Sequence, residues 1–175
     1  MSVLLPASPV STPDDQRTSL GRYWWLLLAL GVVSVAKAQS AKPLFIAADM
    51  VRGPGGSGPG CVLSNRFMRK EEVAWRIRVQ DATGKELDDK SLKSLVVELS
   101  DGQQFQAHFG GHPPKAPADH FWSTAWTIPA DHPTGSFNYK VIATAEDGGM
   151  QTWQPFNTKP SQLTVIDGTF EPPAK

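Results

Sequence analysis

The chain has 175 residues, a length that allows one domain and a short processed segment. Its 17 Lys and Arg residues balance 17 Asp and Glu residues, so the formal net charge is zero. Because nucleic acids and anionic membranes attract clustered Lys and Arg, this composition argues against both classes of partner.

Residues 1–38 follow the pattern of a cleaved signal peptide. Arg17 and Arg22 precede an apolar run over residues 23–35, and the A-x-A motif of residues 36–38 follows it. A helix of about 13 residues would be about 20 Å long, too short to cross a hydrocarbon core of about 30 Å. We therefore expect a periplasmic or secreted protein that has no stable membrane span after cleavage. An uncleaved membrane anchor is the alternative.

Residues 39–60 are expected to contain a first strand and a loop. The strand is indicated by the apolar run at residues 44–46. The loop follows at residues 53–60, whose five glycines and two prolines exclude a helix or a central strand. A phosphate-binding loop is not indicated, because neither a Lys-Ser/Thr pair nor a helix pattern follows the glycines.

Cys61 is the single cysteine of the chain, which excludes an internal disulfide. In an exported protein such a residue is either a buried thiol or bonded to a partner. Because Val62 and Leu63 follow it, and free cysteine is among the most buried residue types, we expect Cys61 to be buried.

Residues 61–168 alternate apolar and polar side chains with the period of two that is typical of half-buried strands. The pattern is clearest at residues 73–79, where every second side chain is Val, Trp or Ile. Residues 169–175 are expected to form a flexible tail. Further strands are predicted at residues 95–99, 104–109, 121–128, 137–145, 151–156 and 162–166.

Turn signals separate the predicted strands at residues 81–84, 101–102 and 148–149. About seven or eight short strands at this spacing predict an all-β sandwich or barrel. Only residues 87–95 are compatible with a helical turn, which Asp88 and Asp89 would cap. The lack of amphipathic helices excludes an enzyme of the βαβ kind.

Residues 125–148 read AWTIPADHPTGSFNYKVIATAEDG. This segment resembles the run W-x-(I/V)-P-A-D-x-P-x-G-x-Y-x-V-x-A-x-D-x-x-G of bacterial immunoglobulin-like and fibronectin type III-like repeats. The resemblance implies an immunoglobulin-like Greek-key sandwich over residues 61–168. It also implies that Tyr139 begins a core strand and that its hydroxyl bonds back to the backbone. It says little about function, because this fold hosts many unrelated roles.

The four histidines all lie within residues 108–132. Three of them, His108, His112 and His120, occupy a strand end and the proline-rich loop after it. Imidazole groups suit copper or zinc, although this spacing matches no zinc signature. Because the spacing matches no zinc signature, we expect no cofactor. A copper or zinc site at these three histidines is the alternative.

The tryptophans outside the signal peptide divide into core and surface candidates. Trp75 lies on the apolar face of its predicted strand and is expected in the core. Trp122 and Trp126 share one strand face, so one or both are expected in the core, with Phe121 pointing the other way. Trp153 lies on a late, edge-like strand, where an exposed ring would stack on a sugar or anchor an interface.

Catalytic patterns are not recognisable in this sequence. No nucleophile elbow surrounds any serine, and the Cys-x-x-Cys-His motif of haem attachment does not occur. The adjacent carboxylates at residues 71–72 and 88–89 are expected to lie in turns and to face solvent, which does not suit glycosidic chemistry. We therefore expect a protein that is not an enzyme.

The leading hypothesis is an exported binding or accessory-subunit module that docks on another periplasmic or secreted protein. Its partner-binding residues are predicted to be Trp153, His112, Pro113, Pro114 and Phe121. One alternative is a periplasmic copper or zinc carrier that uses the histidine-rich loop. Another is a carbohydrate- or cell-wall-binding module, for which an exposed Trp153 or Trp122 is the discriminating feature.

Overall fold

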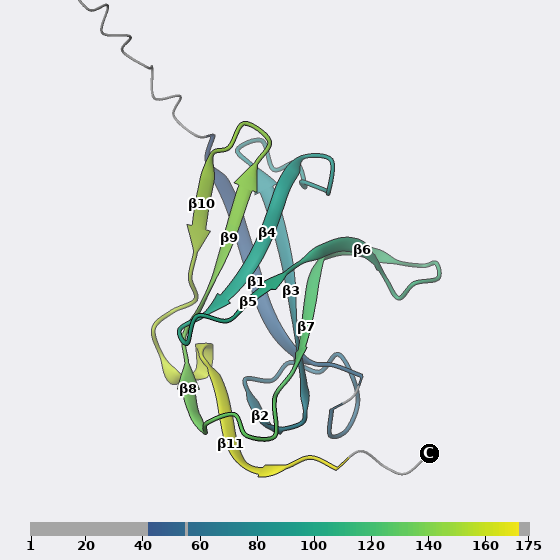
Figure 1. Cartoon of the computed structure of the whole chain (residues 1–175). Helices are drawn as coiled ribbons and strands as arrows, with labels where there is room; N and C mark the ends of the chain where they lie inside the picture. The colour runs from purple at the N-terminus through teal and green to yellow at the C-terminus, as the bar shows by residue number, and fades with distance from the viewer. Residues whose placement is uncertain (1–41, 55, 172–175) are drawn as a thin grey trace, which may run out of the picture. The chain divides into compact units, whose positions relative to one another are not determined.

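A computed structural model describes residues 42–54 and 56–171 of the chain (Figure 1). These residues form an all-β fold, as predicted, and none of them lies in an α-helix. The predicted signal peptide, residues 1–38, lies outside the described residues. The elements are β1 (Leu44–Arg52), β2 (Arg66–Arg69), β3 (Glu72–Asp81), β4 (Leu92–Leu99), β5 (Gln104–Gln106), β6 (His108–His112), β7 (Asp119–Thr127), β8 (Gly135–Phe137), β9 (Tyr139–Ala145), β10 (Met150–Trp153), the 3-10 turn η1 (Lys159–Ser161) and β11 (Leu163–Thr169).

The strands assemble into two four-stranded sheets and a smaller three-stranded one. The first sheet has the order β1-β3-β7-β6, and the second has the order β10-β9-β4-β5. Both are antiparallel throughout. The third sheet, β2-β11-β8, contains one parallel pair, β2 with β11. The two large sheets share one apolar core, which gives the fold the character of a β-sandwich (Figure 1).

The core is built from alternate residues of the strands, as the sequence pattern predicted. On β3 every second side chain is buried, and the four residues concerned are at most 1% exposed. β4 and β9 turn a matching set of apolar side chains toward them from the second sheet. Each fully buried side chain of this kind contributes about 1.5–3 kcal/mol to folding. The residues are Val73, Trp75, Ile77 and Val79 on β3, with Leu95, Val97, Leu99, Val141 and Ala143 opposite.

Trp75 is the centre of this core and joins the two sheets. Its ring stacks on Phe105 of β5 at 5.5 Å between centroids and meets Tyr139 of β9 edge-on at 6.0 Å. Phe105 in turn contacts Trp126 at 5.3 Å, and Tyr139 contacts Trp153 at 6.3 Å. The prediction that Trp75 lies in the core is confirmed, and a continuous series of ring contacts runs from β7 to β10.

The predicted turns join the strands as expected. Gly102 closes the hairpin between β4 and β5 with a φ of 90°, and Gly148 closes the one between β9 and β10 with a φ of 84°. Asp88 caps a single turn by accepting a hydrogen bond from the Ser91 hydroxyl at 2.7 Å, and β4 begins immediately afterwards at Leu92.

Two predicted strands are each divided between two sheets. The strand predicted at residues 104–109 breaks at Ala107, after which β6 leaves the sheet of β5 and pairs with β7. The strand predicted at residues 137–145 breaks in the same way at Asn138, between β8 and β9. Alternation of apolar residues continues across both breaks, so the sequence pattern did not reveal the change of sheet.

Cys61 is exposed, so the prediction that its thiol is buried is wrong. The residue lies at the end of the glycine-rich loop with a φ of 62°, and its N–H donates to the Arg52 carbonyl at 2.8 Å. Val62 and Leu63 are 46% and 65% exposed. This segment is therefore held to the end of β1 by its backbone, and its apolar side chains are not drawn into the core.

Glu71 is 1% exposed, which contradicts the prediction that the carboxylates at residues 71–72 face solvent. Its carboxylate accepts hydrogen bonds from the N–H of Ser57 at 2.9 Å, from the Ser57 hydroxyl and from the N–H of Met68 at 2.6 Å. The guanidinium of Arg52 lies 3.9 Å away. Glu71 thereby fastens the glycine-rich loop onto the body of the domain.

Glu71→Gln should destabilise the protein by about 2–3 kcal/mol, because an amide group would turn donors toward N–H groups that need an acceptor. Burial raises the pKa of Glu71, but the hydrogen bonds from Ser57 and Met68 and the charge of Arg52 outweigh it and lower the pKa below its ordinary value of 4.5. The folded protein therefore favours the ionised form, and this stabilisation is complete above pH 4.5 and lost as the pH falls through the lower folded-state pKa.

Urea denaturation at a series of pH values measures this effect as the difference in unfolding free energy between the wild type and Glu71→Gln. The matched control is Glu72→Gln, which changes the half-exposed neighbouring carboxylate. A difference that is the same at neutral and strongly acidic pH would contradict the assignment of an ionised, hydrogen-bonded Glu71.

Candidate protein-binding groove

The β6–β7 hairpin carries most of the residues that the sequence analysis selected. In its register His112 lies opposite Asp119, and His120 lies opposite Gly111. Because directly paired residues share a face, His108 and His112 lie on one face of the hairpin and His120 lies on the other. The proline-rich segment at residues 113–117 forms the exposed tip of this hairpin.

On the outer face of the hairpin His112 stacks on Phe121, with ring centroids 4.6 Å apart and an interplanar angle of 17°. Its Nε2 lies 3.1 Å from the Ser123 hydroxyl. His120 instead lies beside Phe109, at 6.2 Å between ring centroids. The imidazole of His112 is thus engaged with its own hairpin rather than with the other histidines.

The three predicted metal ligands do not form a metal site in this arrangement. Within residues 42–54 and 56–171, no group of three or more His, Cys, Asp or Glu side chains is placed to hold a metal ion. The opposite orientation of His120 accounts for this, since it separates that imidazole from His108 and His112. The copper or zinc hypothesis stays a prediction from the sequence and gains no support from the geometry.

His132 is the histidine that the sequence analysis set aside, and it is only 6% exposed. Its ring packs edge-on against Trp126 and Phe137, at 5.1 and 4.9 Å between centroids. Its Nδ1 lies 2.9 Å from the Pro133 carbonyl oxygen, and its Nε2 lies 3.3 Å from a carboxylate oxygen of Asp101. These contacts hold the loop between β7 and β8 against the β4–β5 hairpin, which is a structural role.

A groove lies where the end of β10 passes β1. It has a volume of about 660 Å³. Trp153 and Tyr139 contribute rings that are held by the core, whereas Leu63 and Phe156 are 65% and 84% exposed at its margins. The other lining residues are Ala48, Asp49, Met50, Ser64, Asn65, Gln154, Pro155, Pro160 and Ser161.

The groove carries no unbalanced charge. Asp49 is the one charged side chain among its lining residues in the part of the chain described here. Both of its carboxylate oxygens are engaged by Arg76, at 2.8 Å from Nε and 2.7 Å from a terminal nitrogen. The surface that a ligand would meet is therefore apolar and neutral, with amides and hydroxyls at intervals.

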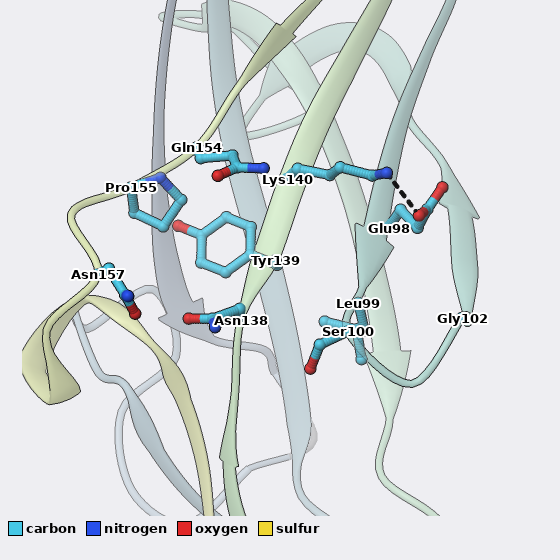
Figure 2. A pocket seen from close by; sticks show the side chains of 10 residues that line it. All are labelled: Glu98, Leu99, Ser100, Gly102, Asn138, Tyr139, Lys140, Gln154, Pro155 and Asn157. Atoms are coloured by element: carbon cyan, nitrogen blue, oxygen red, sulfur yellow. Dashed lines mark ion pairs between the residues drawn. The ribbon is translucent and has the colours of Figure 1, made fainter.

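A second hollow, of about 330 Å³, adjoins the groove on the far side of Gln154 and Pro155 (Figure 2). Its lining is more polar and includes an ion pair between Lys140 and Glu98 at 2.7 Å. Figure 2 shows the hydroxyl of Tyr139 directed toward Pro155, so this ring lies between the two hollows.

The Tyr139 ring begins a core strand as predicted and is 5% exposed. The predicted hydrogen bond from its hydroxyl to the backbone does not occur among the described residues. Burial, and after it the charge of Asp49, raises the pKa of Tyr139 to about 12. The phenol is therefore neutral at physiological pH and can donate a hydrogen bond toward the groove.

The predicted partner-binding residues fall on two separate surfaces. Trp153 lines the groove, whereas His112, Pro113, Pro114 and Phe121 belong to the hairpin. Leu63 and Phe156 were missed, because Leu63 lies outside the predicted strands and Phe156 lies at the end of the strand predicted at residues 151–156, beyond the observed end of β10 at Trp153. The signal that could have found them is an apolar side chain in an otherwise polar or proline-rich loop.

The carbohydrate-binding hypothesis depends on an exposed tryptophan, and Trp122 is only 4% exposed. Its indole N–H donates to the Leu87 carbonyl at 2.8 Å, so the ring is fixed inside the fold. Trp153 is half-buried against Tyr139. A sugar-stacking platform at Trp122 is therefore excluded, and one at Trp153 stays a prediction.

No protein-family model, curated protein or solved structure matches this chain. Among the described residues, no helix has the length and apolar character needed to cross a membrane.

Cys61 offers a direct check of the loop beside the groove. Because the thiol is exposed in the folded protein, we expect Ellman's reagent to titrate one thiol per chain without denaturant. The rate should lie within about tenfold of that measured in urea, since thiol reactivity follows exposure and ionisation. Cys61→Ser should show no reaction, and a thiol that reacts only in urea would contradict the exposed position.

Proposed function

We propose that this protein is an exported, non-enzymatic binding or accessory module that docks on another periplasmic or secreted protein. The observation that carries the proposal is the groove between β1 and residues 153–156, with Leu63 and Phe156 exposed beside it. Large apolar side chains gathered at a hollow are typical of interaction sites, and aromatic anchors dominate the binding energy of protein interfaces.

The groove suits a protein partner because its apolar surface is already formed. Trp153 is held by Tyr139, and Tyr139 by Trp75, so these rings need little ordering when a partner arrives. Interfaces that are fixed before association lose less side-chain entropy on binding. The polar groups of Ser64, Asn65 and Gln154 supply hydrogen-bonding groups around the apolar patch.

An immunoglobulin-like Greek-key sandwich is part of the proposal. The orders β1-β3-β7-β6 and β10-β9-β4 correspond to the A-B-E-D and G-F-C orders of immunoglobulin domains, with β5 as an added edge strand. The run at residues 125–148, which resembles bacterial immunoglobulin-like repeats, supports the same assignment. The sheet of β2, β8 and β11 is additional to that scheme.

Export rests on the signal-peptide pattern of residues 1–38, with its basic residues, apolar run and A-x-A motif. The non-enzymatic part of the proposal rests on the sequence, in which no catalytic pattern such as a nucleophile elbow is recognisable.

The test is native mass spectrometry, with chemical cross-linking, of the mature protein isolated from its own periplasm. We expect an added mass of protein size in the wild type. Leu63→Asp and Phe156→Asp should each reduce the bound fraction at least tenfold, because a charge at the apolar margin would be desolvated on docking. The matched control is Met150→Asp, which places the same charge at a 70% exposed apolar residue outside the groove.

A bare monomer with no cross-linked neighbour would contradict the docking function. A complex that is lost in Met150→Asp but intact in Leu63→Asp and Phe156→Asp would place the docking surface elsewhere on the domain. An added mass of a single metal ion, lost on replacement of His108 and His112, would instead favour the carrier hypothesis.

A further inference from the structure

β1 is an edge strand whose backbone groups alternate in direction. In an antiparallel pair, successive residues turn their N–H and C=O groups alternately toward and away from the neighbouring strand. Met50 turns its carbonyl away from β3 and accepts a hydrogen bond from Ser64 at 3.1 Å, and Arg52 donates outward to Val62 at 2.9 Å. The main-chain N–H and C=O groups of the even-numbered residues of β1 therefore point away from β3.

The outward groups of β1 have partners at its two ends. At the start of the strand, the Leu44 N–H donates to the side-chain oxygen of Gln151 at 2.7 Å, and the amide nitrogen of Gln151 donates to the Leu44 carbonyl. Toward the end of the strand, residues 61–64 bond the Met50 carbonyl and both the N–H and the carbonyl of Arg52. The two large sheets are thus joined at one end of β1, and the loop segment covers the other.

Ile46 and Ala48 lie between these two ends. Their N–H and C=O groups turn away from β3, and no residue within 42–54 or 56–171 supplies a hydrogen-bond partner for them. Ala48 also lines the groove, beside Asp49 and Met50. The free stretch of strand edge and the apolar groove are therefore parts of one surface.

This stretch has no lysine, proline or bulge, and the carboxylate of Asp49 beside it is bound by Arg76. Edges are commonly blocked by lysines, prolines, bulges or very short strands. β1 pairs with β3 in an unbroken register of nine residue pairs, and its sequence LFIAADMVR has no Pro or Lys. Its one Arg lies in the stretch that residues 61–64 already cover. An edge of this kind is a template for another strand.

We infer that the partner binds by adding a β-strand to β1 at Ile46 and Ala48, an inference that rests on the proposed docking function. The occupant is an extended, uncharged segment of the partner polypeptide, with apolar side chains at alternate positions. Its main chain bonds the free N–H and C=O groups, and its side chains on one face contact the groove.

The electrostatics of the groove favour an uncharged strand over a charged one. Asp49, its single charged lining side chain in the described part of the chain, is already neutralised by Arg76. A charged side chain in the incoming strand would lose its hydration without gaining a free counter-charge. Apolar side chains instead bury against Trp153 and Met50, and the backbone dipoles of the edge supply the polar complementarity.

Ala48→Pro tests strand addition, because proline removes the outward N–H and places a ring on the free edge. The bonds between β1 and β3 do not use this N–H, so proline is tolerated there as it is on other edge strands. Ala48→Val is the matched control, since it adds the same number of side-chain carbons and keeps the N–H. Thermal unfolding should show that both variants are folded.

The probe is a displayed library of random ten-residue peptides, selected against the mature wild-type protein. We expect the enriched peptides to have apolar residues at alternate positions. They should bind the wild type and Ala48→Val with Kd values within about threefold, and Ala48→Pro at least tenfold more weakly.

Peptides methylated on alternate backbone nitrogens should lose binding, and the Ile46 and Ala48 amides should exchange their hydrogens at least tenfold more slowly in the complex.

Two results would overturn strand addition and leave the docking function standing. One is a library that yields no binder although the native complex forms. The other is a set of peptides that bind Ala48→Pro as tightly as the wild type and are blocked by Phe156→Asp. A concentration-dependent dimer that Ala48→Pro abolishes would instead assign the edge to a second copy of this chain. Failure of the docking function is separate and appears as a bare monomer in the native extract.

Discussion

The burial of Trp75 between the two large sheets is the constraint on which the rest of this fold depends. Its ring contacts both Phe105 and Tyr139, so the spacing of the sheets is fixed by one side chain. The indole nitrogen is buried without a hydrogen-bond partner among the described residues, which costs about 1–3 kcal/mol. The packing of so large a ring offsets that penalty. Through Tyr139 the same contacts determine where Trp153 lies in the groove.

The opposite wall of the groove depends on a polar interaction instead. Leu63 belongs to a segment that the glycine-rich loop delivers to the end of β1, and Glu71 holds that loop through Ser57. A surface loop of this composition has little intrinsic preference for one conformation. The buried carboxylate selects one, so the position of the groove residue Leu63 is determined by hydrogen bonds several residues away.

The sequence predicted those strands and turns that are determined by residues close together in the chain. The alternation over β3 and β9 and the glycine turns at Gly102 and Gly148 are properties of short windows, and the structure bears them out. The burial of Glu71 was not predictable in this way. It depends on N–H groups from two other segments, which only the folded chain brings together.

The candidate site was predicted only in part, for a related reason. Which face His120 occupies is decided by strand register, and residue spacing in the sequence does not reveal it. Trp153 was identified because aromatic residues are conspicuous, but its neighbours Leu63 and Ala48 come from distant parts of the chain. A groove assembled from four separate segments leaves no local pattern to detect.

The change of sheet at Ala107 has a consequence for how the protein folds. Because the chain leaves the sheet of β4 and β5 at Ala107 and rejoins it only at β9, strands that are far apart in the sequence pair in both large sheets, β3 with β7 and β4 with β9. β4 has no central partner until β9 has been synthesised, and Trp75 lacks one of its two ring contacts until then. Such non-local pairing slows folding and makes it cooperative over the whole domain. An incomplete chain therefore has no stable core.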